Sequence, residues 1–488
     1  MWPRLTTQRL TAALLFILLF AMAARTPVDT DIWWHLRNGE YQLEHRTVVG
    51  EDLFSHTRQG APWTNHSWGA QVVLALVYQV GGDVGLTLLM ALLATGGLAF
   101  VYAASEGSVY IRAFALVLAG ATAAVFWSPR PQMFTFLFSG VVYYLLMRFK
   151  WLGDARALWA IPPVVALWGN LHAGFATAFI LILGVIAGEV VALLFGPRTE
   201  HVIGWRGVGR LALIGVVSVA ALLLNPFGAE ILKVPFATVN IGVLQDFIQE
   251  WASPNFHERQ TWPFIVLLLG SLGFAALSSR RIDWTDLALV TGTAFLALMA
   301  GRNIALFAVV AAPVLARHAE AFLADRGWQI RPATRQSPAM IRLNWALLLV
   351  IVLGSAGKVW YAANPHTVQA AKEAILPVGA VAYINKSRPE GKMFNSYNWG
   401  GYLMYAAPDY PVYVDGRTDL YGDAFLREYL GVLFLKPEWQ AVLDKREIGW
   451  ILIENGSVLD SALRNEARWR LAYEDDLAVI YTRERGES

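Results

Sequence analysis

Long runs of hydrophobic residues recur along most of the chain, between residues 8 and 362. Most are long enough, or nearly so, to cross a hydrocarbon core of about 30 Å as a helix. We predict about eleven such spans, which indicates an α-helical polytopic membrane protein. They cover residues 8–24, 84–104, 113–127, 132–147, 157–169, 175–195, 211–224, 262–278, 284–300, 304–317 and 344–362.

The pattern changes after residue 362, where short apolar runs alternate with polar turns. Alternating strand and helix patterns are typical of a small soluble α/β layer domain. The sequence therefore predicts a transmembrane domain at 1–362 and a soluble α/β domain at 363–488. The expected strands are 392–395, 412–415, 450–454, 469–473 and 478–482, and the expected helices are 424–433, 437–445 and 458–465.

Composition agrees with a membrane protein, because 56% of the residues are hydrophobic and only 16% are charged. The net charge of +2 leaves no concentrated basic surface for nucleic acid, so we expect no nucleic-acid partner. The absence of cysteine excludes disulfides, thiolate metal sites and a cysteine nucleophile. A metal ion would need oxygen or imidazole ligands.

Lysine and arginine collect in alternate loops, and the loops that carry them are expected in the cytoplasm. We therefore expect a multi-pass protein of the inner (plasma) membrane with its N-terminus in the cytoplasm. The 25–83 loop and the tail, residues 363–488, then lie on the extracytoplasmic side. Arg4, Arg9 and the apolar first span also resemble a cleavable signal peptide. We expect this span to be retained as a helix.

The 25–83 loop concentrates acidic, aromatic and histidine residues directly after the first span. Charge beside a membrane segment favours a functional site, since charge is costly to place in lipid. Within the loop, residues 68–80 are apolar but too short to cross, and Gly81-Gly82-Asp83 follows them. We expect a helix along the membrane surface, with one long bent span over 68–104 as the alternative.

Asp29 and Asp31 are the candidate catalytic residues of this loop. Carboxylates at i and i+2 can converge on Mg²⁺ or Mn²⁺, or one can act as general base. The alternative is that they cap the helix that follows them. Trp33 and Trp34 either stack on a sugar or anchor the loop at the bilayer interface.

Further polar residues of the loop are candidates for substrate or metal contacts. Asp52, His56 and His66 could join the aspartate pair in a metal site, although scattered loop histidines are commonly plain polar surface. Outward-facing cations could bind an anionic ligand or lipid headgroups. The candidate substrate-binding residues are Trp34, His35, Asp52, His66, Arg130, His172, Lys233, Arg259 and Arg302.

Two glycine-rich loops in the tail, 395–402 and 415–422, follow expected strands. Such loops often bind ligands, but they also form tight structural turns, and we favour turns here. Neither has the spacing of a dinucleotide or P-loop motif, so nucleotide binding has no support.

With the spans and this loop in place, the chain resembles the GT-C superfamily of polyprenyl-phosphate-sugar-dependent membrane glycosyltransferases. The resemblance lies in the acidic pair after the first span, the segment 68–82 ending in a glycine turn, and the soluble tail. The chain looks especially like an uncharacterised bacterial group with Asp-x-Asp-x-Trp-Trp-His-Leu near the N-terminus and Asp-Gly-Arg-x-Asp-Leu-Tyr in the tail, here at 29–36 and 415–421.

The resemblance implies an inverting transfer of a sugar from a polyprenyl-phosphate-linked donor to a glycan, lipid or protein acceptor on the extracytoplasmic face of the cell envelope. It leaves metal dependence open, since such acidic pairs are compatible with metal-dependent and metal-free members. Two other classes compete: a lipid or glycolipid transporter or flippase, and a noncatalytic membrane scaffold. A transporter predicts ionisable residues inside the spans, where this sequence has few.

Overall fold

The computed structural model describes residues 5–239, 241–243, 250–328 and 336–484. The chain divides into two compact units, neither of which is continuous in sequence. The membrane unit comprises Met1–Arg25, Thr87–Ile231 and Phe247–Ala362. The tail unit comprises Thr26–Leu86, Leu232–Asp246 and Ala363–Ser488. It therefore contains both the 25–83 loop, called the first loop below, and the C-terminal tail.

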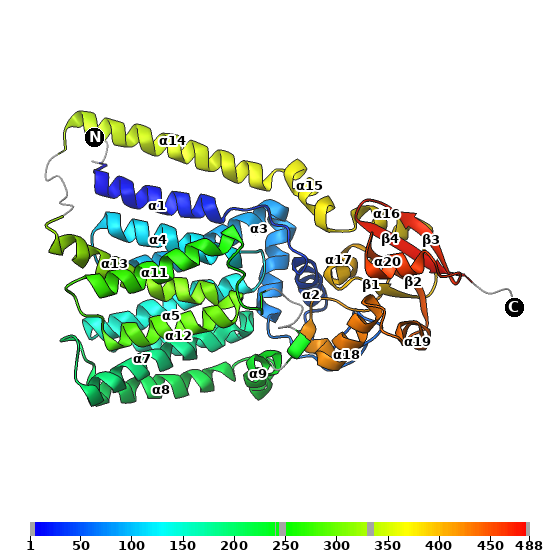
Figure 1. The fold of residues 1–488 in the computed structure, drawn as a ribbon, viewed down its shortest axis with the longest axis horizontal. Coiled ribbons are helices and arrows are strands. Elements are labelled where there is room, and N and C mark those ends of the chain that lie inside the picture. The colour runs from blue at the N-terminus through cyan, green and yellow to red at the C-terminus, as the bar shows by residue number, and fades with distance from the viewer. Residues whose placement is uncertain (1–4, 240, 244–249, 329–335, 485–488) are drawn as a thin grey trace. The chain divides into compact units, whose positions relative to one another are not determined.

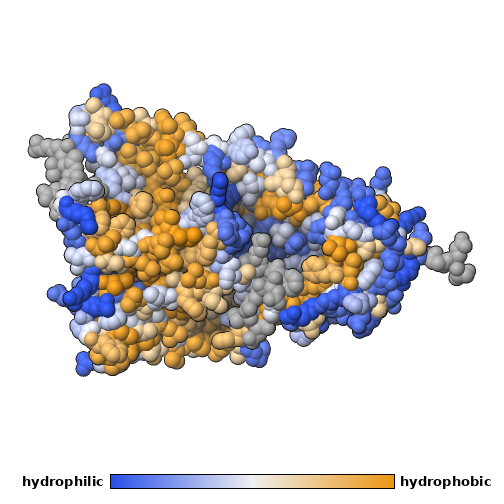
Figure 2. Space-filling view, viewed as in Figure 1, coloured by the Kyte–Doolittle hydropathy of each residue, from blue (hydrophilic) through white to orange (hydrophobic). Residues whose placement is uncertain are grey.

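The membrane unit is built from long apolar helices, drawn from blue to yellow-green in Figure 1. Within the described residues, eight helices are long and apolar enough to cross a membrane and three shorter ones are apolar, which matches the eleven expected spans. Hydrophobic residues gather over these helices in Figure 2. The elements are α1 (Thr7–Ala23), the second part of α3 (Trp68–Ala104), α4 (Val109–Ala123), η1 (Ala124–Phe126), α5 (Gln132–Leu152), η2 (Ala157–Ala160), α6 (Ile161–Leu171), η3 (Ala173–Phe175), α7 (Ala176–Phe195), α8 (Gly204–Leu222), η4 (Gly228–Lys233), η5 (Arg259–Thr261), α11 (Trp262–Leu277), α12 (Trp284–Met299), η6 (Gly301–Asn303), α13 (Ile304–Asp325) and α14 (Pro338–Ala363).

Helix α13 forms the centre of the membrane unit and packs against α4, α5, α11 and α12. In its most apolar stretch 78% of the residues are buried, against 6% for α14. The exposed apolar face of α14 suits contact with lipid tails, because lipid replaces water around a spanning helix. The expected α-helical polytopic fold is therefore confirmed.

Buried ion pairs connect helix ends within the membrane unit. Lys150, near the end of α5, pairs with Glu189 of α7 and lies 3.3 Å from Asp283, the N-cap residue of α12. Arg317 of α13 pairs with Asp286 in the same way. The Lys/Arg bias places all these ends on one side, and their pairing agrees with that alternation.

Helix α3 crosses the boundary between the two units. A straight helix of its 37 residues would measure about 55 Å, well beyond a hydrocarbon core of about 30 Å. The helix breaks at Gly82, whose φ of 53° and ψ of −141° are not helical. The glycine turn expected there is thus present, and it separates the part of α3 preceding it from the spanning part.

The tail unit contains a four-stranded mixed sheet of order β1-β2-β4-β3. Strand β1 (Lys392–Asn395) pairs parallel with β2 (Ile448–Glu454), and β4 (Ala478–Arg483) pairs antiparallel with both β2 and β3 (Trp469–Glu474). Its helices are α2 (Ile32–His45), the first part of α3, α9 (Val234–Val239), α15 (Pro365–Ile375), α16 (Val378–Ser387), α17 (Tyr397–Ala406), α18 (Thr418–Leu433), α19 (Trp439–Lys445) and α20 (Val458–Leu463). The expected α/β tail is confirmed.

One expected strand is absent. Residues 412–415 form only an isolated bridge, between Val412 and Ser55 of the first loop. The reason is that Asn395 at the end of β1 binds this segment through its side chain. Its Oδ1 accepts the Tyr413 amide at 2.7 Å and its Nδ2 donates to the Val414 carbonyl at 2.8 Å, in place of a backbone ladder.

The first loop and the tail share one hydrophobic core. Trp34, Val49 and Trp63 of the loop are buried in the same cluster as the inner residues of the sheet and of α16 and α17. Burying a large apolar side chain contributes about 1.5–3 kcal/mol, so these three residues stabilise the tail unit substantially. The tail members of the cluster are Ala380, Val381, Ile384, Met393, Trp399, Leu403, Met404, Ala407, Val412, Trp450, Leu452, Ala478 and Ile480.

Candidate active site

The two aspartates of the first loop have different local roles. Asp29 Oδ1 accepts the backbone amide of Asp31 at 2.8 Å. Asp31 occupies the N-cap position of α2, yet its side chain makes no capping hydrogen bond. Asp29 thus binds the amide of the N-cap residue and not an amide of the first helical turn, and Asp31 does not cap its own helix through its side chain.

Two glycine-containing segments of the tail pack directly on the acidic segment around Asp29 and Asp31: the loop at Gly416, and the start of α17, which forms a helix where the loop 395–402 was expected. A Cβ added at Gly416 would lie 2.2 Å from Asp31 Oδ1 and 2.9 Å from Trp34 Nε1. A Cβ at Gly401 would lie 3.0 Å from the Thr30 carbonyl oxygen. The Asp-x-Asp motif and both tail segments therefore meet at one place, and the glycines allow that close approach.

The tryptophan pair is part of the protein interior. Trp33 is 3% exposed and its ring centroid lies 5.2 Å from those of Tyr402 and Tyr405. Trp34 is 6% exposed and contacts Trp63 edge to face, with centroids 6.2 Å apart. Neither ring presents a broad face to a sugar, and both fix α2 against the tail.

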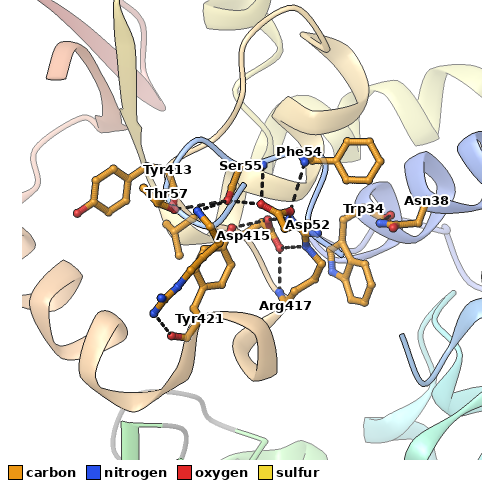
Figure 3. A network of polar contacts seen from close by, with 12 residues as sticks. Trp34, Asn38, Asp52, Phe54, Ser55, Thr57, Tyr413, Asp415, Arg417 and Tyr421 are labelled. Carbon is orange, nitrogen blue, oxygen red and sulfur yellow. Dashed lines mark hydrogen bonds and ion pairs between the residues drawn. The ribbon is translucent and has the colours of Figure 1, made fainter. Parts of the chain in front are cut away.

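Behind the acidic segment, a buried ionic network joins the loop to the tail (Figure 3). Arg417 donates to both oxygens of Asp415, at 2.8 and 2.7 Å, and its Nη2 lies 2.8 Å from Asp52 Oδ1. Asp52 also accepts the Ser55 hydroxyl at 2.6 Å and the Ser55 amide at 3.1 Å. Since all three charged residues are at most 1% exposed, this network is a structural support rather than a surface for substrate.

Burial and charge within the network fix the protonation states of Arg417 and Tyr421. Burial alone would lower the pKa of Arg417, but the Asp415 carboxylate outweighs it and the pKa is raised. Burial, reinforced by Asp415, raises the pKa of Tyr421. Tyr421 therefore stays neutral and its hydroxyl donates to Asp415 at 2.7 Å.

The histidines of the loop and Asp52 are engaged elsewhere. His56 Nε2 lies 2.8 Å from the Met393 carbonyl oxygen, and His66 Nδ1 lies 2.9 Å from Ser67 Oγ. His35 is 5% exposed and stacks on Trp34. Within the described ranges no group of three or more histidine, aspartate or glutamate side chains could hold a metal ion.

In the membrane unit, the predicted cation Arg302 lines a cavity of about 340 Å³, and the predicted cation Arg130 pairs with Glu250, which also lines it. Arg130 Nη2 lies 3.0 Å from Glu250 Oε2, and the Arg302 amide donates to the Glu250 carbonyl at 3.0 Å. The Arg302 guanidinium also lies over the Trp251 ring, 4.0 Å from its centroid. Burial would raise the pKa of Glu250, but Arg130 and Arg302 hold it below its usual value.

Residues of both charges line this cavity. The charged residues that line it are Arg302, Glu250 and Glu258, and its polar lining residues are Gln132, Ser253, Asn255, Gln260 and Thr261. The guanidiniums of Arg130 and Arg302 are balanced by the carboxylates of Glu250 and Glu258, so these four residues together carry no net charge. A phosphate oxygen is the ligand that such a planar, forked donor binds best.

The other predicted cations lie apart from this pair. His172 Nδ1 lies 2.8 Å from Thr135 Oγ1 and 3.0 Å from the Gly174 amide, in the turn after α6. Arg259 is exposed between two residues that line the cavity. Lys233 is exposed at the end of η4, in the tail unit.

Sequence reasoning missed Glu250 and the partners of Asp52. Glu250 follows a stretch without a clear pattern, and nothing in the sequence links it to Arg130, 120 residues earlier. The signal that existed was the pair of glycine-rich tail loops. Glycines at positions that need no positive φ can mark places where another chain segment comes close.

Comparison with known proteins gives structural neighbours only. The chain matches no family model and no curated protein sequence. It is similar to the oligosaccharyltransferase AglB of Archaeoglobus fulgidus, solved with an inhibitory peptide and a dolichol-phosphate, with a TM-score of 0.56 and 13% identity over 91% of this chain and 69% of that one. The same enzyme tethered to an acceptor peptide gives a TM-score of 0.58 and 12% identity over 92% and 69%.

A weaker likeness is to ArnT of Cupriavidus metallidurans bound to undecaprenyl phosphate, with a TM-score of 0.47 and 12% identity over 97% of both chains. Identities this low speak for the fold alone. The chain therefore shares the fold of the Archaeoglobus fulgidus oligosaccharyltransferase over most of its length.

Proposed function

We propose that this protein is a membrane glycosyltransferase that moves a sugar from a polyprenyl-phosphate-linked donor to an acceptor on the extracytoplasmic face. The observation that carries the proposal is the place of the Asp31 carboxylate, which is partly exposed and lies against Gly416 of the tail. The neighbouring fold supports it, since AglB was solved with a dolichol-phosphate and with an acceptor peptide.

In this proposal Asp31 is the general base. It accepts the proton of the acceptor hydroxyl or amine while that atom attacks the anomeric carbon. The bond from the anomeric carbon to the phosphate oxygen breaks, and the lipid phosphate leaves with the electron pair. A single displacement inverts the anomeric centre. Asp29 holds the Asp31 backbone through its amide.

Arg130 and Arg302 are the proposed ligands of a phosphate. Each guanidinium can donate two parallel hydrogen bonds to phosphate oxygens and neutralise charge on a leaving group. Glu250 orients Arg130 at 3.0 Å and lowers the cost of keeping two cations together. His172, Lys233 and Arg259 have weaker support as donor ligands because none of them lines this cavity.

A divalent cation fits the acidic segment only in part. Asp29 and Asp31 offer the oxygen ligands that Mg²⁺ and Mn²⁺ prefer, and Mg²⁺ is commonly bound by one or two carboxylates plus substrate phosphates. When bound, such an ion would supply charge neutralisation at the phosphate. The residues Asp52, His56 and His66 would not add ligands, since their polar atoms have the partners described above.

Asp31→Asn in lipid nanodiscs tests the proposal. The amide keeps the shape but lacks a basic oxygen, so release of labelled sugar from a polyprenyl-phosphate donor should fall by about 10² to 10⁴. Donor binding should persist. Asp409→Asn, at an exposed tail position, is the matched control and should retain full turnover. A parallel assay with chelator, then with Mg²⁺ or Mn²⁺ restored, measures metal dependence.

Full activity of both Asp29→Asn and Asp31→Asn would remove the acidic pair from the chemistry and end the proposal. No turnover by the wild type across a panel of donors and acceptors would instead favour a transporter or a scaffold. The buried charges of the described membrane helices give a transporter little support, because Lys150 pairs with Glu189 and Asp283 at helix ends rather than along the span interiors.

A further inference from the structure

The tail loop 415–418 lies against the acidic segment in a way that fixes the Asp31 carboxylate. We propose that Gly416 and Arg417 are positioning residues for Asp31: Gly416 forms the wall that the carboxylate rests on, and Arg417 holds that wall in place. The expected effect on turnover rests on the proposed function. The expected effect on the conformation of residues 28–36 does not.

The first step concerns the need for glycine at residue 416. Gly416 is not among the glycines with positive φ, so its backbone conformation is open to other residues. Space is the constraint, because an added Cβ would lie 2.2 Å from Asp31 Oδ1 and 3.1 Å from Asp31 Cγ. A carbon and an oxygen cannot approach that closely, so any side chain here displaces something.

The second step shows which side yields. The loop is held by the two-point contact between Arg417 and Asp415, by the Asp52 carboxylate and by the Tyr421 hydroxyl, all of them buried. Breaking such buried pairs costs several kcal/mol. The Asp31 side chain is partly exposed and can rotate away at far lower cost. A side chain at 416 therefore displaces the Asp31 carboxylate first, and also presses on Trp34 Nε1, which would lie 2.9 Å from the added Cβ, while the loop itself stays in place.

The third step is that the preceding segment is fixed as well. The Val412 amide donates to the Phe54 carbonyl and the His56 amide donates to the Val412 carbonyl, both at 3.0 Å. A Cβ at Gly400 would lie 2.0 Å from the Val414 carbonyl oxygen. The loop thus meets the first loop on one side and α17 on the other, which leaves it little freedom to adjust.

The test compares Gly416→Ala with Gly431→Ala in the full chain in lipid nanodiscs. Gly431 lies in the same helix-and-loop region, but its added Cβ would meet only the flexible Lys436 side chain, at 3.4 Å or more. We expect Gly416→Ala to lower kcat by about 10²-fold with an unchanged KM for the donor, since misplacing a reacting group by about 1 Å has effects of this size. Gly431→Ala should match the wild type.

A double-mutant cycle separates positioning from general damage. If Gly416 acts through Asp31, Gly416→Ala should add little to the loss already caused by Asp31→Asn. If it merely weakens the fold, the two losses should multiply. Multiplying losses, or full turnover of Gly416→Ala, would overturn the inference.

A second readout needs no activity. Hydrogen exchange of the peptide covering residues 28–36 should rise in Gly416→Ala and not in Gly431→Ala, while exchange in β2 and β4 stays unchanged. Unchanged exchange at 28–36 would also overturn the inference. If the wild type transfers no sugar but this exchange pattern appears, the positioning stands and the proposed function fails.

Discussion

Replacing Arg417 should destabilise the tail unit far more than replacing Asp52. In the Asp52–Arg417–Asp415 network one guanidinium serves two carboxylates, and all three groups are at most 1% exposed. Arg417→Met leaves two buried carboxylates without their cation. Removing one partner of a buried pair costs about 3–5 kcal/mol, and here two anions lose theirs, so we expect a loss at the top of that range.

Asp52→Asn has a smaller expected effect for a reason visible in the same contacts. Arg417 keeps both hydrogen bonds to Asp415, and the remaining pair is neutral overall. The asparagine oxygen can still accept from the Ser55 hydroxyl and amide. The expected loss is about 1.5–3 kcal/mol, the range for a hydrogen bond to a charged group.

Native-state hydrogen exchange of β2 and β4 in the full chain measures both losses, because these buried strands exchange only when the tail unit opens. A loss of 3–5 kcal/mol corresponds to an exchange rate increased by roughly 10² to 10³·⁵. Helix α13 of the membrane unit is the internal control and should be unaffected. Equal effects of the two variants, or a larger effect of Asp52→Asn, would refute the charge argument.

Three shorter predictions follow. Burial lowers the pKa of His56 despite its contact with the Met393 carbonyl, so on acidification the unfolded chain binds a proton that the folded chain does not. The stability of the tail unit should therefore fall as pH drops below about 6.5. His56→Gln should flatten this pH dependence when stability is measured by hydrogen exchange at several pH values. Cysteines introduced singly at the exposed residues Gln59 and Ser461 should both react with an impermeant thiol reagent on intact cells, whereas a cysteine at exposed Glu200 should not. Labelling at only one of Gln59 and Ser461 would refute the topology. Arg302→Ala should weaken binding of a polyprenyl phosphate by about 1.5–3 kcal/mol in a direct binding assay, and unchanged affinity would exclude it as a phosphate ligand.

The membrane helices were predictable because length and hydropathy leave few alternatives for such segments. The Lys/Arg bias also predicts that the charged ends of α5, α7 and α12 lie on the same side of the membrane. In the structure Lys150 of α5 pairs with Glu189 of α7. The helix starting at Ile32 and most tail strands followed from periodicity. The strand expected at 412–415 failed because Asn395 replaces backbone pairing with side-chain bonds, which periodicity does not register.

The contacts of the site were less accessible to sequence reasoning. Asp52 was considered as a metal or substrate ligand, but its partner is Arg417, which lies 365 positions further along the chain and cannot be identified from local pattern. The glycines at 400, 401 and 416 were interpreted as turn residues. They instead permit close approach of other segments, which depends on tertiary packing.

The shared core changes how substitutions in the tail should be interpreted. Trp34 lies three residues after Asp31 and packs in the cluster that also holds Trp399, Trp450 and Ile480. The orientation of α2, and with it the direction of the Asp31 carboxylate, is therefore set by residues of the tail. A fragment beginning near residue 365 would lack Trp34, Val49 and Trp63 from this core, and the membrane helices without the tail would lack the surface that shapes the acidic segment. Substitutions in β1, α17 or the 415–418 loop should then change turnover as active-site substitutions do, although none of these residues need touch a substrate.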